Sequence, residues 1–190
     1  GNYKISTKKI FYLILTLVLA IIFYFYYEIY SSNKYMDNST QKGNMNIPID
    51  ENAPVKSMSQ IEIEAPVDTV WEILTNINNW TTWQKDVSKT VVHGEIKQGT
   101  KFDWKAGGLS FKSEIHTSIP KSMFGWTGTT LGASAIHNWF FEAKDNVTVV
   151  RVEESLQGIF PGLFTGYFQK NLDSGVLKNL KELKSAAEKK

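Results

Sequence analysis

Residues 61–87 read IEIEAPVDTVWEILTNINNWTTWQKDV, and the passage from strand to helix in this stretch determines the fold. Alternating polar and apolar residues over 57–64 predict a first strand, which ends before Pro66. Proline is favoured in the first turn of a helix, so a helix is predicted to begin there. The apolar residues that follow have helical spacing: Val70, Trp71, Ile73, Leu74 and Ile77. Two asparagines end this helix, and residues 80–83 predict a short second helical turn.

The chain after residue 87 predicts about six short strands and then one long helix. Turn signals separate strands at Gly107-Gly108, Pro120-Lys121 and Asp145-Asn146. The segment after Pro161 carries one apolar stripe, formed by Phe164, Phe168, Leu172, Val176, Leu180, Leu183 and Ala187. Together with the first strand, these elements predict an α+β fold of about seven strands, with two short helices near the start and a long C-terminal helix.

The turns also predict the strand registers. The Gly-Gly turn pairs Trp104 with Phe111, so the apolar residues of both strands share one face. The Asp-Asn turn places His137 opposite Glu154 on the same apolar face. The candidate ligand-binding residues of this face are Phe102, Trp104, Phe111, Trp126, His137, Trp139, Phe141 and Glu154.

His137 and Glu154 form the sharpest chemical feature of the sequence. A carboxylate on an apolar face is costly to bury in its ionised form unless it is paired. An imidazole at cross-strand distance can pair with it, and either group can bond the polar end of a ligand. A purely structural pair, a ligand-orienting pair, an acid–base pair and a bend that carries Glu154 to solvent all remain open. The first two are favoured over catalysis, because buried paired groups are commonly structural.

The other two histidines carry no comparable signal. Strand alternation places His116 on the solvent face, in phase with Glu114 and Ser118, and His93 ends a strand beside Gly94. The separation of the three histidines does not match a metal-ligand spacing. The sequence therefore predicts neither a metal nor a cofactor.

Residues 10–27 read IFYLILTLVLAIIFYFYY, 18 residues without a charge. A helix of this length is about 27 Å long and can cross the hydrocarbon core of a membrane, and aromatic residues near both ends are typical of membrane interfaces. A cleaved signal peptide fits less well, because bulky aromatics stand where a cleavage site needs small residues. We therefore predict a single-pass transmembrane anchor at 10–27, preceded by a basic flank at 1–9.

Residues 28–54, polar over most of their length, predict a flexible tether between this anchor and a domain over 55–190. Lysines are denser before the anchor than after it, which favours a cytoplasmic N-terminus. The predicted localisation is the cell membrane, with the folded domain on the extracytoplasmic side.

Composition excludes several classes of protein. The chain has 190 residues and no cysteine, which excludes disulfide scaffolds, thiolate metal sites and a cysteine nucleophile. Its net charge of +2 gives no indication of a nucleic-acid partner. The 42% apolar content is ample for a packed core.

Two stretches of the chain resemble the START-like, helix-grip superfamily, and specifically its polyketide cyclase/dehydrase-type (SRPBCC) members. Residues 61–87 resemble the opening of the family, and residues 136–158, IHNWFFEAKDNVTVVRVEESLQG, resemble its penultimate hairpin. The resemblance covers about 55–187 and implies a curved antiparallel sheet that grips the last helix, with an apolar cavity between them. The positions that match the family motif are Ala65, Pro66, Val70, Trp71, Trp80, Trp83, His137, Trp139, Glu153 and Glu154.

The resemblance leaves the activity open, because the superfamily includes lipid carriers, hormone receptors, cyclases, hydrolases and co-chaperone modules. We favour a membrane-tethered binding protein for a small hydrophobic or lipid-like ligand. The alternative is a cyclase- or hydrolase-type enzyme that uses Glu154 as a base and His137 as its partner. A third hypothesis is a protein-interaction module with a filled core. The sequence predicts no oligomeric state.

Overall fold

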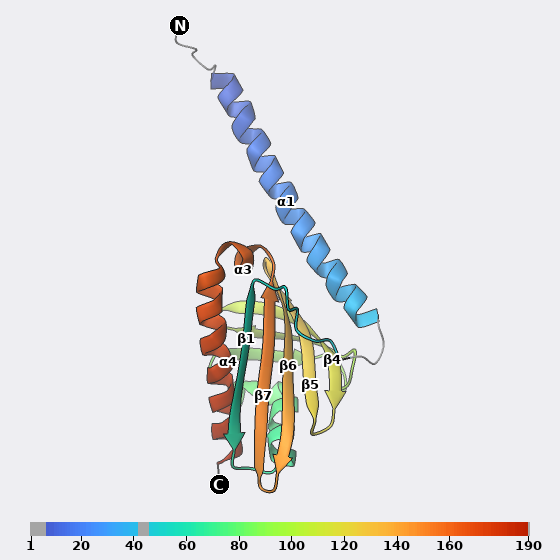
Figure 1. Cartoon of the computed structure of the whole chain (residues 1–190). Helices are drawn as coiled ribbons and strands as arrows, with labels where there is room; N and C mark the ends of the chain where they lie inside the picture. Colours follow the sequence, from blue (N-terminus) through green and yellow to red (C-terminus); the bar gives the residue numbers. More distant parts are fainter. Residues whose placement is uncertain (1–6, 42–45, 190) are drawn as a thin grey trace.

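The computed structural model describes residues 7–41 and 46–189 of the chain. Its elements follow one another in the order that the sequence predicts for the domain (Figure 1). They are α1 (Thr7–Gln41), β1 (Val55–Ile63), α2 (Val67–Thr75), η1 (Ile77–Thr82), β2 (Val87–Val92), β3 (Lys101–Ala106), β4 (Leu109–Ile119), β5 (Met123–Thr130), β6 (Ala133–Lys144), β7 (Val147–Gln157), α3 (Ile159–Leu163) and α4 (Thr165–Ala187).

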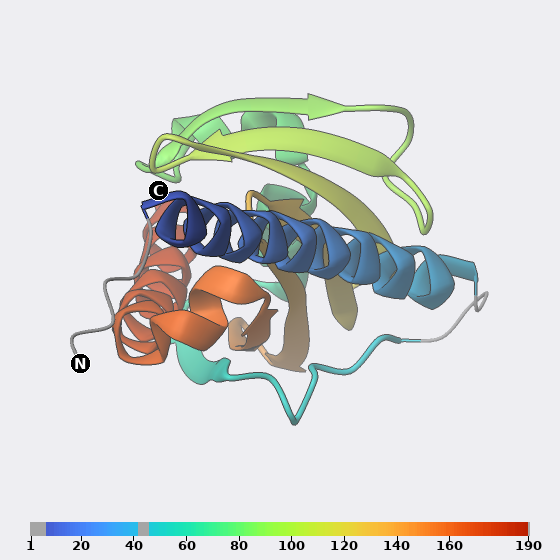
Figure 2. The same cartoon turned by 90° about the horizontal axis from the view of Figure 1, so that it is seen from above.

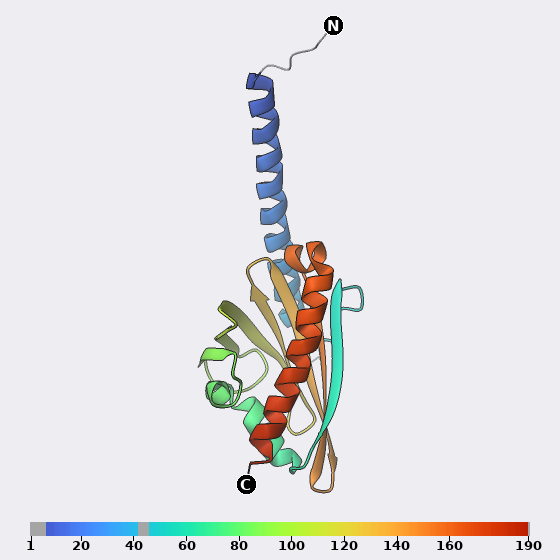
Figure 3. The same cartoon turned by 90° about the vertical axis from the view of Figure 1, so that its left-hand side faces the viewer.

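The seven strands form one antiparallel sheet in the order β1-β7-β6-β5-β4-β3-β2. The sheet is curved, as the view from the α3 end shows (Figure 2). Helix α4 lies beside β1 along one side of the sheet (Figures 1 and 3). The main hydrophobic core joins the inner face of the sheet to α2, η1 and α4. This arrangement confirms the predicted helix-grip fold.

Turn chemistry fixes the two registers that matter for the site. Gly107 and Gly108 both have positive φ, the conformation that a two-residue hairpin turn requires, and Trp104 pairs with Phe111 as predicted. The turn between β6 and β7 also has the predicted register, with His137 opposite Glu154. The inner face of the sheet is therefore the one that the sequence indicates.

The prediction for His116 is wrong. The register of β4 against β5 shifts between Ile115 and Thr117, which marks a bulge at His116. A bulge breaks the two-residue alternation of a strand. His116 still lies on the outer face that alternation predicts, but it is only 3% exposed, because the segment around Ile47 covers it and the Ile47 N–H bonds its ring.

The C-terminal segment forms two helices where the sequence predicts one. Phe164 has a non-helical backbone, with φ −121° and ψ 42°, and separates α3 from α4. The predicted apolar stripe is confirmed from Leu172 onward, where five of its residues are buried. Phe164 itself lies outside the core and is 56% exposed.

The N-terminal region differs from its prediction in three ways. Helix α1 is 35 residues long and continues through the first part of 28–54, where we predict a flexible tether. Residues 46–54 contain no helix or strand, turn at 51–52 and are bonded to the sheet: the Asp50 N–H donates to Ser155 Oγ at 3.0 Å. No helix within 7–41 or 46–189 is long and apolar enough to cross a membrane, so the predicted transmembrane anchor at 10–27 is not supported.

Candidate functional site

The inner face of the sheet carries a row of paired residues from β1 to β5. Ser57 on β1 pairs with Glu154 on β7, Glu154 with His137 on β6, and His137 with Trp126 on β5. Side chains of directly opposed residues lie on the same face of an antiparallel sheet. The row therefore brings a hydroxyl, a carboxylate and an imidazole together on an otherwise apolar face.

His137 and Glu154 are in direct contact. His137 Nδ1 lies 2.8 Å from Glu154 Oε2, and the two side chains are 8% and 14% exposed. An ionised carboxylate only accepts hydrogen bonds, so the imidazole donates through Nδ1–H. Pairing and mutual hydrogen bonding are what allow both groups to lie in the interior.

Two tryptophans hold the imidazole ring in place. The His137 ring stacks on Trp126, with centroids 4.4 Å apart and planes 14° apart. It also stacks on Trp139, with centroids 5.6 Å apart and planes 9° apart. Aromatic stacking on either side, together with the bond to Glu154, leaves the ring little freedom to rotate.

Two buried nitrogen atoms of this cluster have no hydrogen-bond partner in the described part of the chain, and they are His137 Nε2 and Trp139 Nε1. Most buried polar atoms in proteins are bonded, so such atoms indicate a partner supplied from outside the chain. With Nδ1–H committed to Glu154, Nε2 of the neutral ring is an acceptor, whereas the indole N–H is a donor. The pair can therefore bond a group that both donates and accepts.

The rest of the predicted lining set lies on the same inner face. Phe102, Trp126 and Phe141 are buried in the core, and Trp104 stacks on Phe111 with centroids 4.5 Å apart. Trp80 from η1 packs against this part of the face, in ring contact with Phe102, Trp104 and Trp126. The region near Trp80 is thus filled by protein side chains, whereas the unpartnered atoms lie at His137 and Trp139.

Helix α4 contributes polar groups that the sequence does not reveal. Ser57 Oγ donates to Asp173 Oδ1 at 2.7 Å, and Gln169 Nε2 donates to the same oxygen at 3.0 Å. Gln169 also bonds the backbone of Lys56 through both its amide atoms. Gln169 and Asp173 are four residues apart and so share a helix face, but their spacing does not indicate which strand they contact.

A family model described as polyketide cyclase/dehydrase and lipid transport matches residues 54–188. This match covers the sheet, α2, η1, α3 and α4, including the His137 cluster. The chain belongs to this family. The N-terminal helix α1 lies outside the matched region.

Several solved structures share the fold of the matched region. This chain is similar to the hypothetical protein jhp0584 of Helicobacter pylori. The two share 15% identity over 77% of this chain and 97% of the other, with a TM-score of 0.67. A START superfamily protein of Mycobacterium smegmatis shares 10% identity over 70% of this chain and 97% of its own, with a TM-score of 0.61. The Zhui aromatase/cyclase of Streptomyces sp. R1128 shares 14% identity over 70% and 93%, with a TM-score of 0.59.

At these identities the likeness shows the fold alone. No protein of curated function matches the chain in sequence.

The outer face of the sheet carries a second buried histidine, His116. Its Nδ1 accepts from Thr117 Oγ1 at 2.8 Å and from the Ile47 N–H at 3.4 Å. Burial lowers the pKa of His116 to about 4, and the nearby Asn138 amide partly opposes this shift. Asn138 Nδ2 donates to the Ile47 carbonyl at 2.9 Å. His116 and Asn138 together bond both backbone groups of Ile47.

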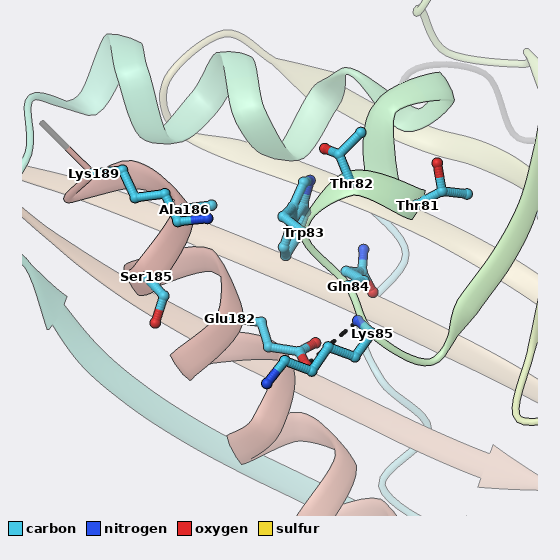
Figure 4. A pocket seen from close by; sticks show the side chains of 9 residues that line it. All are labelled: Thr81, Thr82, Trp83, Gln84, Lys85, Glu182, Ser185, Ala186 and Lys189. Carbon is cyan, nitrogen blue, oxygen red and sulfur yellow. Dashed lines mark hydrogen bonds between the residues drawn. The ribbon is translucent and has the colours of Figure 1, made fainter.

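A hollow of about 370 Å³ lies between η1 and the last turns of α4 (Figure 4). Trp83 lines it, and its buried Nε1 has no partner among the described residues. Lys85 and Lys189 line the hollow together with Glu182, whose Oε1 accepts from the Lys85 N–H at 3.4 Å. This mixture of charges favours neither an anion nor a cation, and the hollow is separate from the His137 cluster.

A metal site is not found among the described residues. Within 7–41 and 46–189, no three His, Asp or Glu side chains lie close enough together to hold an ion. His93 bonds the exposed Asp103 at 2.7 Å, away from the other two histidines.

Proposed function

We propose that the chain binds a small hydrophobic ligand between the sheet and α4, and that His137 and Trp139 bond the polar end of this ligand. The proposal rests on one observation: two buried nitrogen atoms, His137 Nε2 and Trp139 Nε1, have no partner in the described part of the chain. An unbonded buried polar atom costs about 1–3 kcal/mol, and a bound ligand removes this cost.

The polar end that fits best is a hydroxyl group. A hydroxyl donates to an imidazole nitrogen and accepts from an indole N–H at the same time. A purely apolar ligand leaves both atoms unbonded, and a carboxylate cannot donate to Nε2 of the neutral ring. Membership of a family described as polyketide cyclase/dehydrase and lipid transport supports a hydrophobic body for the ligand.

Two probes of equal size test the proposal, namely 1-naphthol and 1-methylnaphthalene, which differ in the hydroxyl. We expect the full chain to bind 1-naphthol about tenfold more tightly, which corresponds to about one hydrogen bond. The His137→Ala variant should lose this preference. The His93→Ala variant changes an exposed histidine and should keep it. Equal binding of the two probes by the unchanged protein would contradict the proposal.

Native mass spectrometry of the full chain gives an independent test. The purified protein should carry a hydrophobic molecule of host origin, and the His137→Ala variant should carry less of it. Recovery of that molecule chemically unchanged after incubation supports a carrier or sensor.

A second candidate function is an enzyme in the same site. The observation that favours it is that Glu154 bonds one ring nitrogen of His137, whereas the other, Nε2, has no partner among the described residues. In this arrangement Nε2 can take a proton from a ligand. In this geometry His137 is the base and Glu154 its partner, the reverse of the roles expected from the sequence. Glu154→Gln should then lower turnover about a hundredfold or more while ligand binding changes little.

We also propose that the chain is held at the cell membrane through residues 10–27, with the domain on the extracytoplasmic side. The described side chains of Tyr12–Tyr27 support this, because none is charged and nearly all are exposed. Washing of membranes at high pH tests the association, and protease treatment of intact cells tests the side. Release of the chain by the wash would contradict the proposal.

A further inference from the structure

Two uncharged stretches of the chain meet at one end of the domain. Residues 122–136 and 155–169 contain no Asp, Glu, Lys or Arg. The first stretch includes the turn between β5 and β6, and the second includes the end of β7, α3 and the start of α4. The Phe160 N–H donates to the Gly132 carbonyl at 3.4 Å, so the β5–β6 turn packs on α3. A Cβ at Gly132 would lie 2.5 Å from the Phe160 ring, which shows how closely the two segments fit.

Four apolar side chains project from this end into solvent. Leu131 is 77% exposed, Leu163 68%, Phe164 56% and Tyr167 70%. Leu131, Leu163 and Tyr167 are the most exposed large apolar side chains of the described chain outside α1. We call these four residues the apolar tip. Isolated exposed apolar residues are ordinary, but a group of four on adjoining segments without a charge indicates a contact surface.

The opposite end of the domain has a different character. The turn between β4 and β5 carries Lys121, which is paired with Asp68. At the end of α4, Lys184 pairs with Glu188 at 2.7 Å. These two ion pairs lie at the end that holds the chain's C-terminal residues, whereas the two stretches that form the apolar tip carry no charge.

The position of α1 indicates what the apolar tip contacts. The N-terminal half of α1, which holds the uncharged residues 10–27, extends beyond the α3 end of the domain in two perpendicular views (Figures 1 and 3). The apolar tip lies at that same end. Aromatic and aliphatic side chains without charges suit the boundary between lipid headgroups and acyl chains.

We propose that the apolar tip docks into the surface of a lipid bilayer. The proposal goes beyond ligand binding, and it rests on the membrane association proposed above while assigning contact to different residues. Because the two segments carry no charge, docking does not depend on anionic lipids. It also places the α3 end of the sheet, and not the charged end, against the membrane.

The absence of cysteine makes the test direct, because one introduced cysteine takes one label. The full chain is prepared as Leu163→Cys and, as a matched control, Ile119→Cys, each with the same environment-sensitive fluorophore. Ile119 is 52% exposed and is the last residue of β4, beside the turn at the other end of β5. Both proteins are mixed with phosphatidylcholine vesicles that contain or lack a lipid-borne quencher.

We expect the label at Leu163 to shift to the blue and to be quenched at least threefold more strongly than the label at Ile119. A rise in salt from 0.1 to 0.5 M should leave this difference unchanged, because no ion pair takes part. Equal quenching at the two positions overturns the proposal.

Flotation of the same samples separates this proposal from the one on which it rests. If the chain floats with the vesicles but the Leu163 label remains in water, membrane association stands and docking of the apolar tip is wrong. If the chain does not float and the label remains in water, both are wrong. If the label is shielded without vesicles and light scattering shows a dimer, the apolar tip is a self-association surface and the proposal is overturned.

Discussion

The two faces of the sheet each bury a histidine, and the two imidazoles have different partners. On the inner face, His137 bonds the carboxylate of Glu154 and stacks between two tryptophans. On the outer face, His116 bonds a hydroxyl and a backbone N–H, and its pKa is lowered to about 4. Burial in the same sheet therefore gives two kinds of site. On the outer face, burial among neutral partners disfavours the charged form of His116.

Removal of the carboxylate tests the inner face and should have the largest effect. Glu154→Ala leaves His137 buried without its partner, and loss of one member of a buried pair typically costs about 3 kcal/mol. We expect the free energy of unfolding, measured with urea, to fall by about that amount. Asp103→Asn is the matched control, because it breaks a histidine–carboxylate bond in which both side chains are 51% exposed. The control should change stability by less than about 0.5 kcal/mol.

Acid should affect stability through the outer face. The pKa of His116 is about 4 in the folded protein, against 6.5 for an unperturbed histidine. Above pH 6.5 both states hold a neutral imidazole. As the pH falls from 6.5 to 4, the unfolded chain takes up the proton first, and the free energy of unfolding falls by up to about 3 kcal/mol.

The His116→Gln variant should lack this component of the pH dependence. Urea unfolding at pH 7 and at pH 4.5 measures the difference between the variant and the unchanged protein. If both lose the same stability on acidification, burial of a neutral His116 is not the cause.

A smaller loss of stability is expected from a change in β5, at Gly125. A Cβ at Gly125 would lie 2.5 Å from both His116 Cε1 and Asn138 Oδ1. Gly125→Ala should therefore displace both side chains and lower the free energy of unfolding by about 2 kcal/mol, as overpacking does. Gly107→Ala is no suitable control because its φ is positive, so Gly162→Ala, which has open space around it, serves instead.

The smallest expected loss of stability comes from the bond between Asn138 and the segment around Ile47. Asn138→Ala removes the donor to the Ile47 carbonyl and should lower the free energy of unfolding by about 1 kcal/mol. Cleavage by a protease near residues 42–50 should become faster in this variant. An unchanged cleavage rate would show that the bond does not hold the segment.

Sequence reasoning succeeded where local chemistry decides the structure. The Gly107-Gly108 turn sets the register of β3 against β4. The Asp145-Asn146 turn sets that of β6 against β7 and so brings His137 and Glu154 together. Alternation did not predict the burial of His116, because the covering segment around Ile47 is distant in the sequence and leaves no periodic signal in the strand. The bond between Ser57 and Asp173 was also not predicted, because the two residues are 116 positions apart and no pattern in the sequence relates them.

The N-terminal region shows the same limit. Polar composition over 28–54 predicts a tether, but helix α1 extends to Gln41 and residue 47 is bonded to two side chains of the sheet. The bonds of residue 47 are made by its backbone N–H and carbonyl groups, which nearly every residue has. Composition therefore cannot indicate that this particular segment lies on the outer face.

His137 and Asn138 are consecutive residues of β6, and successive residues of a strand point to opposite faces. A single peptide unit therefore separates the inner-face imidazole from the outer-face amide. The first is tied to the segment that leads to α1, and the second is tied to Glu154. A displacement of the segment around Ile47 therefore acts on β6 one residue away from the imidazole.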